Sequence, residues 1–135
     1  MKCIFVDTSA WVAVVDRADQ HHAAAAGFYR GIFQRYRALV TTNLVVAETY
    51  VLLRRALGLE PALGWWKSIS TSPRVEVLYA SPDEMHSVLA VLRKFSDHPL
   101  SLTDAHSFVT MRQRRIEDAF AFDAHFTLAG FTRLP

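Results

Sequence analysis

The chain has 135 residues, of which 51% are hydrophobic and 21% charged, and its formal net charge is +2. This length and composition suit one domain with a sizeable core and exclude a disordered, fibrous or linker-rich protein, since Gly and Pro number only five each. The net charge is too small to hold nucleic acid by charge alone. Twelve of the 15 basic residues are arginines, whose planar group suits phosphates and carboxylates, although codon bias can produce the same skew.

Short apolar strand patterns alternate with helical patterns along the chain. Strands are expected at 3–6, 38–41, 74–78 and 119–122, with an edge strand at 131–133. Helices are expected at 10–15, 22–36, 44–56, 59–69, 82–95, 102–115 and 123–129. This alternation predicts right-handed crossovers and a mostly parallel sheet with helices on both faces. The predicted fold class is α/β, with a single domain over residues 1–135 and a central sheet of four to five strands.

The single cysteine, Cys3, excludes an internal disulfide framework and a multi-cysteine zinc site. It lies in an apolar strand pattern, which favours an inert buried thiol over a reactive one. No apolar stretch reaches membrane-spanning length, because Glu48 and the Arg54–Arg55 pair interrupt the longest candidate. Asp7 stands where a signal peptide needs an unbroken apolar core. We expect a cytoplasmic protein without membrane association.

Three aspartates stand where a ligand-binding cleft is expected. Asp7 directly follows the first strand, and Asp123 directly follows the strand that ends at Phe122. Ligands of open α/β sheets bind at the carboxyl ends of the strands, so both acids are candidates for a site. Asp104 lies in the first turn of its predicted helix. Each aspartate also has a structural alternative, because an acid at a helix start caps backbone N–H groups or complements the helix dipole.

Glu48 is harder to explain as a structural residue. The residues three and four positions away on its predicted helix are all apolar: Leu44, Val45, Val51 and Leu52. A carboxylate within an apolar stripe destabilises the fold if it stays unpaired. Glu48 must therefore be neutral, paired or directed into a cleft, and a buried ion pair with Arg55 is the structural alternative.

A shared divalent cation would reconcile these four carboxylates. If they converge, their mutual repulsion raises their pKa values or forces them apart, and a hard cation removes that conflict. Ligation by carboxylate oxygens suits Mg²⁺ or Mn²⁺ better than zinc. Such an ion lowers the pKa of a bound water, orients it and stabilises charge on a phosphate in the transition state. Phosphodiester hydrolysis is the reaction that fits this set of ligands.

Five stretches, in order over essentially the whole chain, carry a resemblance to a known family. They are VDTSAW at 6–11, the segment from Asp16 to His22, TN at 42–43 with VAET at 46–49, LSLTDA at 100–105 with Ser107, Phe108 and Met111, and FDAHF at 122–126 followed by AGF at 129–131. Together they resemble the PIN-domain ribonucleases and, more narrowly, the VapC-type toxins of bacterial toxin–antitoxin pairs. No acid of the family pattern is missing.

This resemblance implies a PIN-like nuclease domain over residues 1–135. It implies that Asp7, Glu48, Asp104 and Asp123 form a catalytic acidic pocket in which Asp7, Asp104 and Asp123 bind Mg²⁺ or Mn²⁺, with Glu48 acting directly or through water. Thr8 or Ser9 would position these ligands. The implied reaction is metal-dependent endonucleolytic cleavage of RNA that leaves a 5′-phosphate and a 3′-hydroxyl. No organic cofactor is implied.

The resemblance also implies partners. Members of the family usually form homodimers and are inhibited by a cognate antitoxin, whose C-terminal segment crosses the groove of the active site. The protein would then be the toxin of a type II toxin–antitoxin system with an RNA substrate. The alternative is a non-catalytic RNA- or partner-binding module on the same fold. The retained acids argue against that alternative, because a polyanion binder gains nothing from a negative pocket without metal.

Three other enzyme or signalling classes lack a required residue or element. A haloacid-dehalogenase-type phosphatase needs an acid two positions after Asp7, where Ser9 stands. A receiver domain needs a paired acid and a lysine at a strand end, and no lysine occupies such a position. A ribonuclease H-like nuclease begins with antiparallel hairpins, whereas a helical pattern follows the first strand of this chain directly.

Aromatic and basic clusters keep two interpretations each. Trp65 and Trp66 are adjacent on a helix and cannot both face one way, so we expect one in the core and the other at a dimer or antitoxin contact, with RNA stacking as the alternative. Arg112, Arg114 and Arg115 either complement the dipole at the end of a helix or contact phosphates. The six histidines show no zinc-binding pattern. We expect surface or packing roles for them, including His98, His106 and His125.

Overall fold

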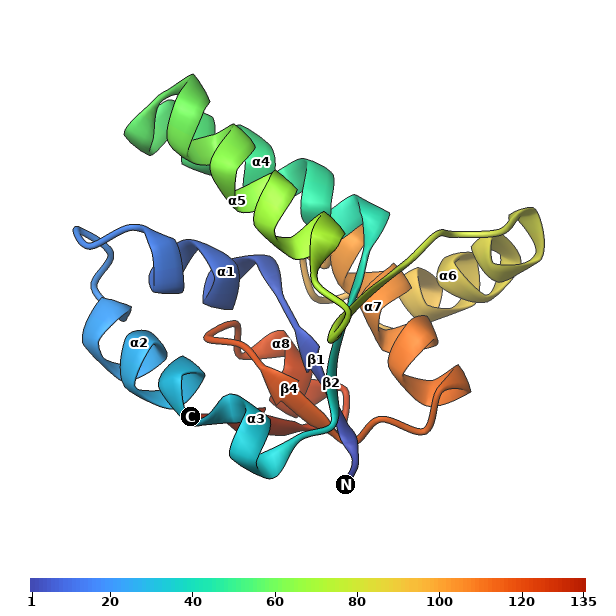
Figure 1. Cartoon of the computed structure of the whole chain (residues 1–135). Helices are drawn as coiled ribbons and strands as arrows, with labels where there is room; N and C mark the ends of the chain where they lie inside the picture. Colours follow the sequence, from blue (N-terminus) through green and yellow to red (C-terminus); the bar gives the residue numbers. More distant parts are fainter.

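Five strands form one parallel sheet in the order β3-β2-β1-β4-β5 (Figure 1). This computed structural model describes residues 1–135. The strands are β1 (Cys3–Val6), β2 (Ala38–Thr42), β3 (Val75–Leu78), β4 (Asp118–Phe120) and β5 (Thr132–Leu134). The predicted α/β class and the predicted parallel sheet of four to five strands are confirmed.

Eight helices flank the sheet. They are α1 (Thr8–Val15), α2 (His22–Arg30), α3 (Ile32–Arg35), α4 (Asn43–Leu57), α5 (Leu59–Thr71), α6 (Pro82–Lys94), α7 (Leu102–Gln113) and α8 (His125–Leu128). Helices α4 and α5 lie side by side as a hairpin at the top of Figure 1, and α6 packs against α7 on the right. Gly58 joins the two helices of the hairpin with a φ of 97°, a conformation that glycine adopts without a steric penalty.

The main core surrounds the central strand. Ile4, Phe5 and Val6 of β1 are fully buried, as expected for a parallel strand covered on both faces. The sheet and most of the helices contribute to a cluster of 25 buried apolar residues, whereas α6 and α7 share a smaller cluster. No helix is long and apolar enough to cross a membrane. Cys3 is half-buried rather than buried, and its thiol accepts a hydrogen bond from Arg37 at 3.3 Å.

The helix predicted at 22–36 is divided into α2 and α3 at Gly31. Glycine is the weakest helix former after proline, so a break is favoured at this position. The second helix also stops at Arg35, because Tyr36 adopts an extended backbone. The hydroxyl of Tyr36 donates a buried hydrogen bond of 2.6 Å to Asp118 at the start of β4. A contact across 82 positions thus sets the end of this helix.

The strand predicted at 119–122 lies at Asp118–Phe120 instead. Phe122 leaves the ladder because its backbone N–H donates to the hydroxyl of Ser9 at 2.9 Å, not to a neighbouring strand. The other predicted elements differ from the observed ones by at most two residues at either end. The sequence pattern therefore located every strand, and long-range hydrogen bonds set where some of them end.

Helix α7 ends in a Schellman motif with an arginine where glycine is usual. The N–H of Ile116 donates to the carbonyl of Met111 at 2.8 Å, and the N–H of Arg115 donates to that of Arg112 at 3.2 Å. Arg115 takes a φ of 54° and is the one non-glycine residue with a positive φ. The left-handed conformation costs an L-residue about 1–2 kcal/mol.

We therefore expect Arg115→Gly to stabilise the fold. Glycine relieves the left-handed strain but loses about 0.5–1 kcal/mol in chain entropy, so the net gain is about 0.5–1 kcal/mol and Tm rises by a few degrees. Thermal unfolding of the two proteins measures this shift. Arg93→Gly, inside the last turn of α6, is the matched control and should lower Tm by a similar amount. Equal destabilisation by both variants would contradict the strain at residue 115.

Candidate active site

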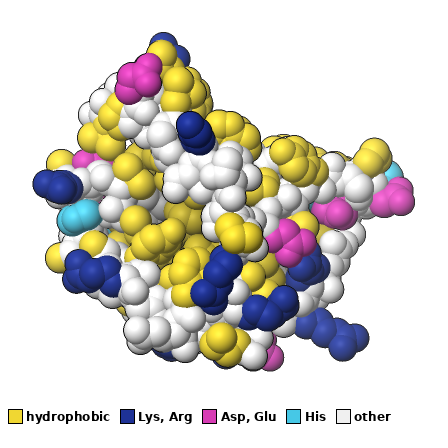
Figure 2. Space-filling model, in the orientation of Figure 1, with side chains coloured by type: hydrophobic (Ala, Val, Ile, Leu, Met, Phe, Trp, Pro, Cys, Tyr) yellow, Lys and Arg dark blue, Asp and Glu magenta, His cyan; other side chains and the backbone are white.

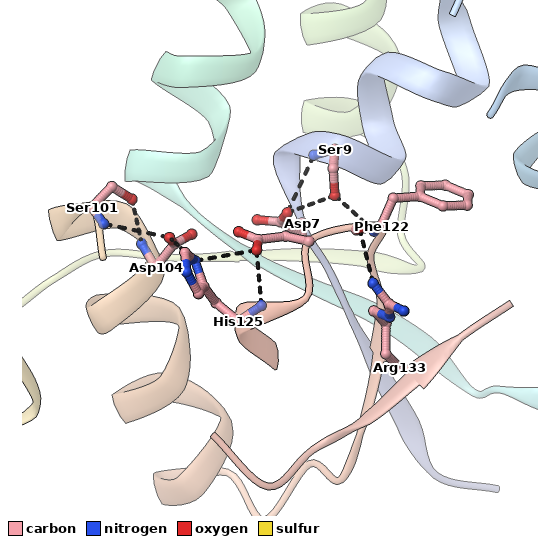
Figure 3. Close-up of polar contacts among 8 residues, drawn as sticks. Asp7, Ser9, Ser101, Asp104, Phe122, His125 and Arg133 are labelled. Atoms are coloured by element: carbon pink, nitrogen blue, oxygen red, sulfur yellow. Dashed lines mark hydrogen bonds and ion pairs between the residues drawn. The ribbon is translucent and has the colours of Figure 1, made fainter. Parts of the chain in front are cut away.

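The three predicted aspartates lie close together at the carboxyl edge of the sheet, where Figure 3 labels Asp7 and Asp104. Asp7 directly follows β1 and caps α1, and its backbone N–H donates to the carbonyl of Phe120 in β4 at 3.0 Å. Asp123 lies beyond β4, and Asp104 lies in the first turn of α7. Parallel strands place their carboxyl ends side by side, so this convergence is a direct consequence of the topology.

Asp104, Asp123 and His125 form the tightest cluster. One ligand atom from each of the three lies within 4.8 Å of the others. The Nδ1 atom of His125 lies 3.2 Å from Asp123 Oδ1 and 3.6 Å from Asp104 Oδ2, an ion-pair geometry rather than a directed hydrogen bond. The backbone N–H of His125 also donates to Asp123 Oδ1 at 2.9 Å. His125 therefore holds the second carboxylate in place with its own backbone.

Asp104 is anchored by a capping box at the start of α7. The hydroxyl of Ser101 accepts from the Asp104 N–H at 3.0 Å, and Asp104 Oδ2 accepts from the Ser101 N–H at 3.4 Å. The second oxygen of Asp104 accepts no hydrogen bond from the chain and remains available to a ligand. The structural and functional interpretations of this aspartate are thus compatible, because one oxygen can serve each role.

Ser9 orients the carboxylate of Asp7. Its hydroxyl donates to Asp7 Oδ2 at 2.7 Å and accepts the N–H of Phe122 at 2.9 Å, which ties the start of α1 to the segment that carries Asp123. The hydroxyl of Thr8 is buried without a partner. Of the two residues expected to position the ligands, Ser9 makes the contact.

Burial makes this site electrostatically unfavourable when all its acids are ionised. The Asp7 side chain is only 3% exposed, and burial, with the nearby charges of Asp104 and Asp123, raises its pKa to about 7 despite the hydrogen bonds from Ser9. Burial and the charge of Asp123 also raise the pKa of Asp104, and His125 partly opposes this shift. A positive ligand would remove the conflict.

Glu48 lies near the other acids but contacts none of them. After burial and Asp123, its charge is a further cause of the raised pKa of Asp104. It accepts no hydrogen bond and forms no ion pair, and Arg55 is exposed without an acidic partner, so the predicted alternative of a buried Glu48–Arg55 pair is wrong. The apolar stripe is also less buried than predicted, since Val51 and Leu52 are 42% and 40% exposed.

The structure corrects the expected role of His125. The ring belongs to the acidic cluster and not to an ordinary surface, and its position two residues after Asp123 was the available signal. The buried Nδ1 atom without a hydrogen-bond partner and the one free oxygen of Asp104 fit a site built to hold a cation. Asp7 and Glu48 lie outside the 4.8 Å cluster and approach it from β1 and α4.

Two aromatic predictions have different outcomes. Trp65 is buried and packs edge-to-face against Trp11 with ring centroids 5.7 Å apart, which confirms that one of the adjacent tryptophans is in the core. Trp66 is half-buried, and its contact with a partner stays a prediction. Beside the acids, the ring of His21 stacks on Phe122 at 4.3 Å.

The fold and this cluster together define a PIN domain. The family model described as "PIN domain" matches residues 4–131, and the chain belongs to that family. It is 33% identical over 131 residues, 97% of each chain, to the 23S rRNA-specific endonuclease VapC20 of Mycobacterium tuberculosis. The resemblance stated from the sequence is thereby confirmed.

Solved structures agree with this assignment. The crystal structure of M. tuberculosis VapC20, described as a sarcin-ricin loop cleaving toxin, matches with a TM-score of 0.87 and 32% identity over 96% of both chains. FitAcB from Neisseria gonorrhoeae matches with a TM-score of 0.68 and 13% identity, covering 98% of this chain and 96% of the other. VapBC2 from Rickettsia felis, bound to a promoter DNA fragment, matches with a TM-score of 0.67 and 9% identity, covering 97% and 96%. These last two matches show the shared fold alone.

Proposed function

We propose that this protein is a Mg²⁺- or Mn²⁺-dependent endoribonuclease and the toxin of a type II toxin–antitoxin pair. The observation that carries the proposal is the convergence of Asp7, Asp104 and Asp123 at the carboxyl edge of the sheet, with raised pKa values at two of them. The relative named as a 23S rRNA-specific endonuclease supports RNA as the substrate. Ribosomal RNA is accordingly the first substrate to assay.

Asp7, Asp104 and Asp123 would hold the divalent ion, and Glu48, whose charge helps to raise the pKa of Asp104, would complete the site directly or through water. When bound, such an ion activates a water and neutralises charge on the phosphate. The residues of the chain supply the positioning. Ser9 fixes Asp7, and the capping box leaves one oxygen of Asp104 free.

His125 has a positioning role in this proposal. Its backbone N–H holds Asp123, and its ring lies between the carboxylates of Asp104 and Asp123. The ring also fills space between Asp104 and Asp123, which sets the separation of their oxygens. We infer that the cluster is preorganised by the chain itself.

Partners follow from the same family relationship. A cognate antitoxin would cover the acids and inhibit cleavage, and a homodimer would be the functional unit. Co-expression with the product of a short reading frame directly upstream should relieve growth inhibition, and continued inhibition would contradict that pairing.

The test of the proposed activity compares cleavage of ribosomal RNA by the wild-type protein, Asp104→Asn and Asp83→Asn. Asp83 is also an acid in the first turn of a helix, α6, but it is exposed and distant from the cluster in the chain, so it is the matched control. We expect Mg²⁺- or Mn²⁺-dependent cleavage by the wild type and Asp83→Asn, none in EDTA, and a loss of activity on the order of 10³-fold in Asp104→Asn.

The products should carry a 5′-phosphate, which mapping of the RNA ends detects. Equal cleavage by all three proteins would remove the proposal, since the activity would then come from a contaminant. Tight RNA binding that needs no metal, without any cleavage, would favour the non-catalytic binding module instead.

Glu48→Gln is expected to lower activity less than loss of an aspartate. The carboxylate acts at a distance through its charge on Asp104, so we expect a loss of about 10–100-fold at limiting metal. Saturating Mn²⁺ should restore most of the rate. Glu60→Gln, an exposed acid in the first turn of α5, is the control and should leave the rate unchanged. A loss that metal does not relieve would show that Glu48 contacts the substrate.

A further inference from the structure

A second charged site lies at the opposite edge of the sheet from the acids. A cavity of about 290 Å³ opens between the start of β1, the start of β2 and the turn after α7. It is lined by Lys2, Cys3, Arg37, Arg114, Arg115, Ile116 and Glu117. Four of these seven side chains are cationic and one is acidic. Lys and Arg side chains also gather on the lower right of the molecule in Figure 2.

Two of the four cations are already paired within the chain. Lys2 lies 3.0 Å from Asp118, and Arg114 makes a two-pronged contact with Glu76 at 2.8 and 3.0 Å. These contacts hold the two side chains beside the cavity. The remaining charged residues of the lining are Arg37, Arg115 and Glu117, which together carry a net positive charge.

Arg37 and Arg115 form no ion pair, although Arg37 helps to lower the pKa of nearby Glu76 and the acid Glu117 lines the same cavity. The only side-chain hydrogen bond of Arg37 goes to the sulfur of Cys3, and Arg115 makes none. Both side chains are exposed, Glu117 offsets only one of their two positive charges, and each guanidinium group presents planar donors that match an oxyanion. An oxyanion bound between the two arginines would neutralise the excess positive charge of this cavity.

Arg115 is also placed at a cost to the fold. It occupies the left-handed position of the Schellman motif, where glycine is favoured. Complementing the helix dipole does not require it there, because Arg112 already lies in the last turn of α7. The dipole explanation thus accounts for Arg112 and leaves the guanidinium of Arg115 unexplained.

We propose that this cavity binds a phosphate group between Arg37 and Arg115. The phosphate is either a backbone phosphate of an RNA held at the acidic site or a free phosphate compound. The RNA source rests on the proposed function, and β1, which separates the two sites, is only about 13 Å long.

Cys3 provides a reporter inside the cavity. It is the only cysteine in the chain, half-buried, and its sulfur contacts Arg37. An occupied cavity should shield the thiol from alkylation. The rate of modification by iodoacetamide, measured by mass spectrometry in EDTA, thus reports on the cavity and requires no nuclease activity.

The first arm of the experiment uses inorganic phosphate. We expect phosphate to slow alkylation of the wild-type protein several-fold relative to chloride at equal ionic strength. Arg115→Lys should retain most of this protection, and Arg115→Asn should lose it, since asparagine tolerates the left-handed backbone but carries no charge. Arg93→Asn, at an exposed arginine outside the cavity, should behave as the wild type. Each variant is compared with itself in chloride, which cancels changes in intrinsic thiol reactivity.

The second arm uses a structured RNA in EDTA, so that binding is measured without cleavage. If RNA supplies the phosphate, RNA at micromolar concentration protects Cys3, and Arg115→Asn lowers the salt dependence of RNA affinity by about one phosphate contact. Protection by phosphate but not by RNA assigns the site to a free phosphate compound. Equal alkylation rates in chloride, phosphate and RNA overturn the proposal, whether or not the protein cleaves RNA.

Discussion

Asp7→Asn is expected to abolish RNA cleavage and, in the metal-free protein, to increase the free energy of unfolding at pH 8. The pKa of Asp7 rises from 3.8 to about 7 on folding. Because the folded pKa is the higher one, the native state binds the proton more tightly, and stability falls as pH rises from about 4 to 7. The full loss above pH 7 is about 4 kcal/mol, at 1.36 kcal/mol for each pKa unit.

Asparagine removes this titration. It keeps an oxygen that can accept from Ser9, but it buries an N–H₂ group whose missing partner costs about 1–3 kcal/mol. The net gain at pH 8 is therefore about 1–3 kcal/mol. Urea unfolding in EDTA measures this difference in the free energy of unfolding. At pH 5 the stability advantage of Asp7→Asn over the wild type should be about 2–3 kcal/mol smaller than at pH 8.

Asp97→Asn is the matched control for this experiment, since the Asp97 side chain is 83% exposed. It should change neither the stability at the two pH values nor the cleavage rate. If Asp7→Asn shifted stability equally at pH 5 and pH 8, the Asp7 carboxyl would not titrate in this window. Retained cleavage would separately exclude Asp7 as a metal ligand.

Mg²⁺ or Mn²⁺ is expected to stabilise the protein strongly. A cation that binds only the native state at 100 times its Kd adds about 2.7 kcal/mol, which raises Tm of a chain of this size by roughly 8–10 °C. The increase should be larger at pH 8 than at pH 5, because protons and metal compete for the raised carboxyls of Asp7 and Asp104. Thermal unfolding with and without EDTA gives the comparison.

The double variant Asp104→Asn/Asp123→Asn should lose this response, whereas Asp83→Asn should keep it. An unchanged Tm on addition of either ion to the wild type would count against a metal site in these residues. A similar shift in the double variant would place the ion elsewhere on the surface.

Local sequence signals determined much of the fold. The unbroken apolar run of β1 predicted a strand covered on both faces, because alternation is lost when neither face meets water. The side chains of Asp7, Thr42, Ser81 and Ser101 cap the helices that follow them, since their oxygens accept N–H groups a few residues away. Asp7 and Asp123 were predictable as site residues because strand ends of a parallel sheet share one edge.

Long-range contacts decided what local patterns could not. The end of α3 depends on the Tyr36–Asp118 hydrogen bond, and the end of β4 depends on the contact between Phe122 and Ser9. The helical period predicted a buried stripe around Glu48, but the hairpin of α4 and α5 leaves part of that stripe exposed. The helical period of apolar residues shows which residues share one face of a helix, but it does not show whether another element buries that face.

By itself the sequence determined the α/β class, the order of the elements and the aspartates that follow β1 and β4, because these depend on local propensity and on the fixed direction of parallel strands. Only the tertiary structure placed His125 between two carboxylates and gathered Arg37 and Arg115 around one cavity. The reason is physical: charge and burial at a point depend on residues distant in the chain, and no local pattern records which of them meet.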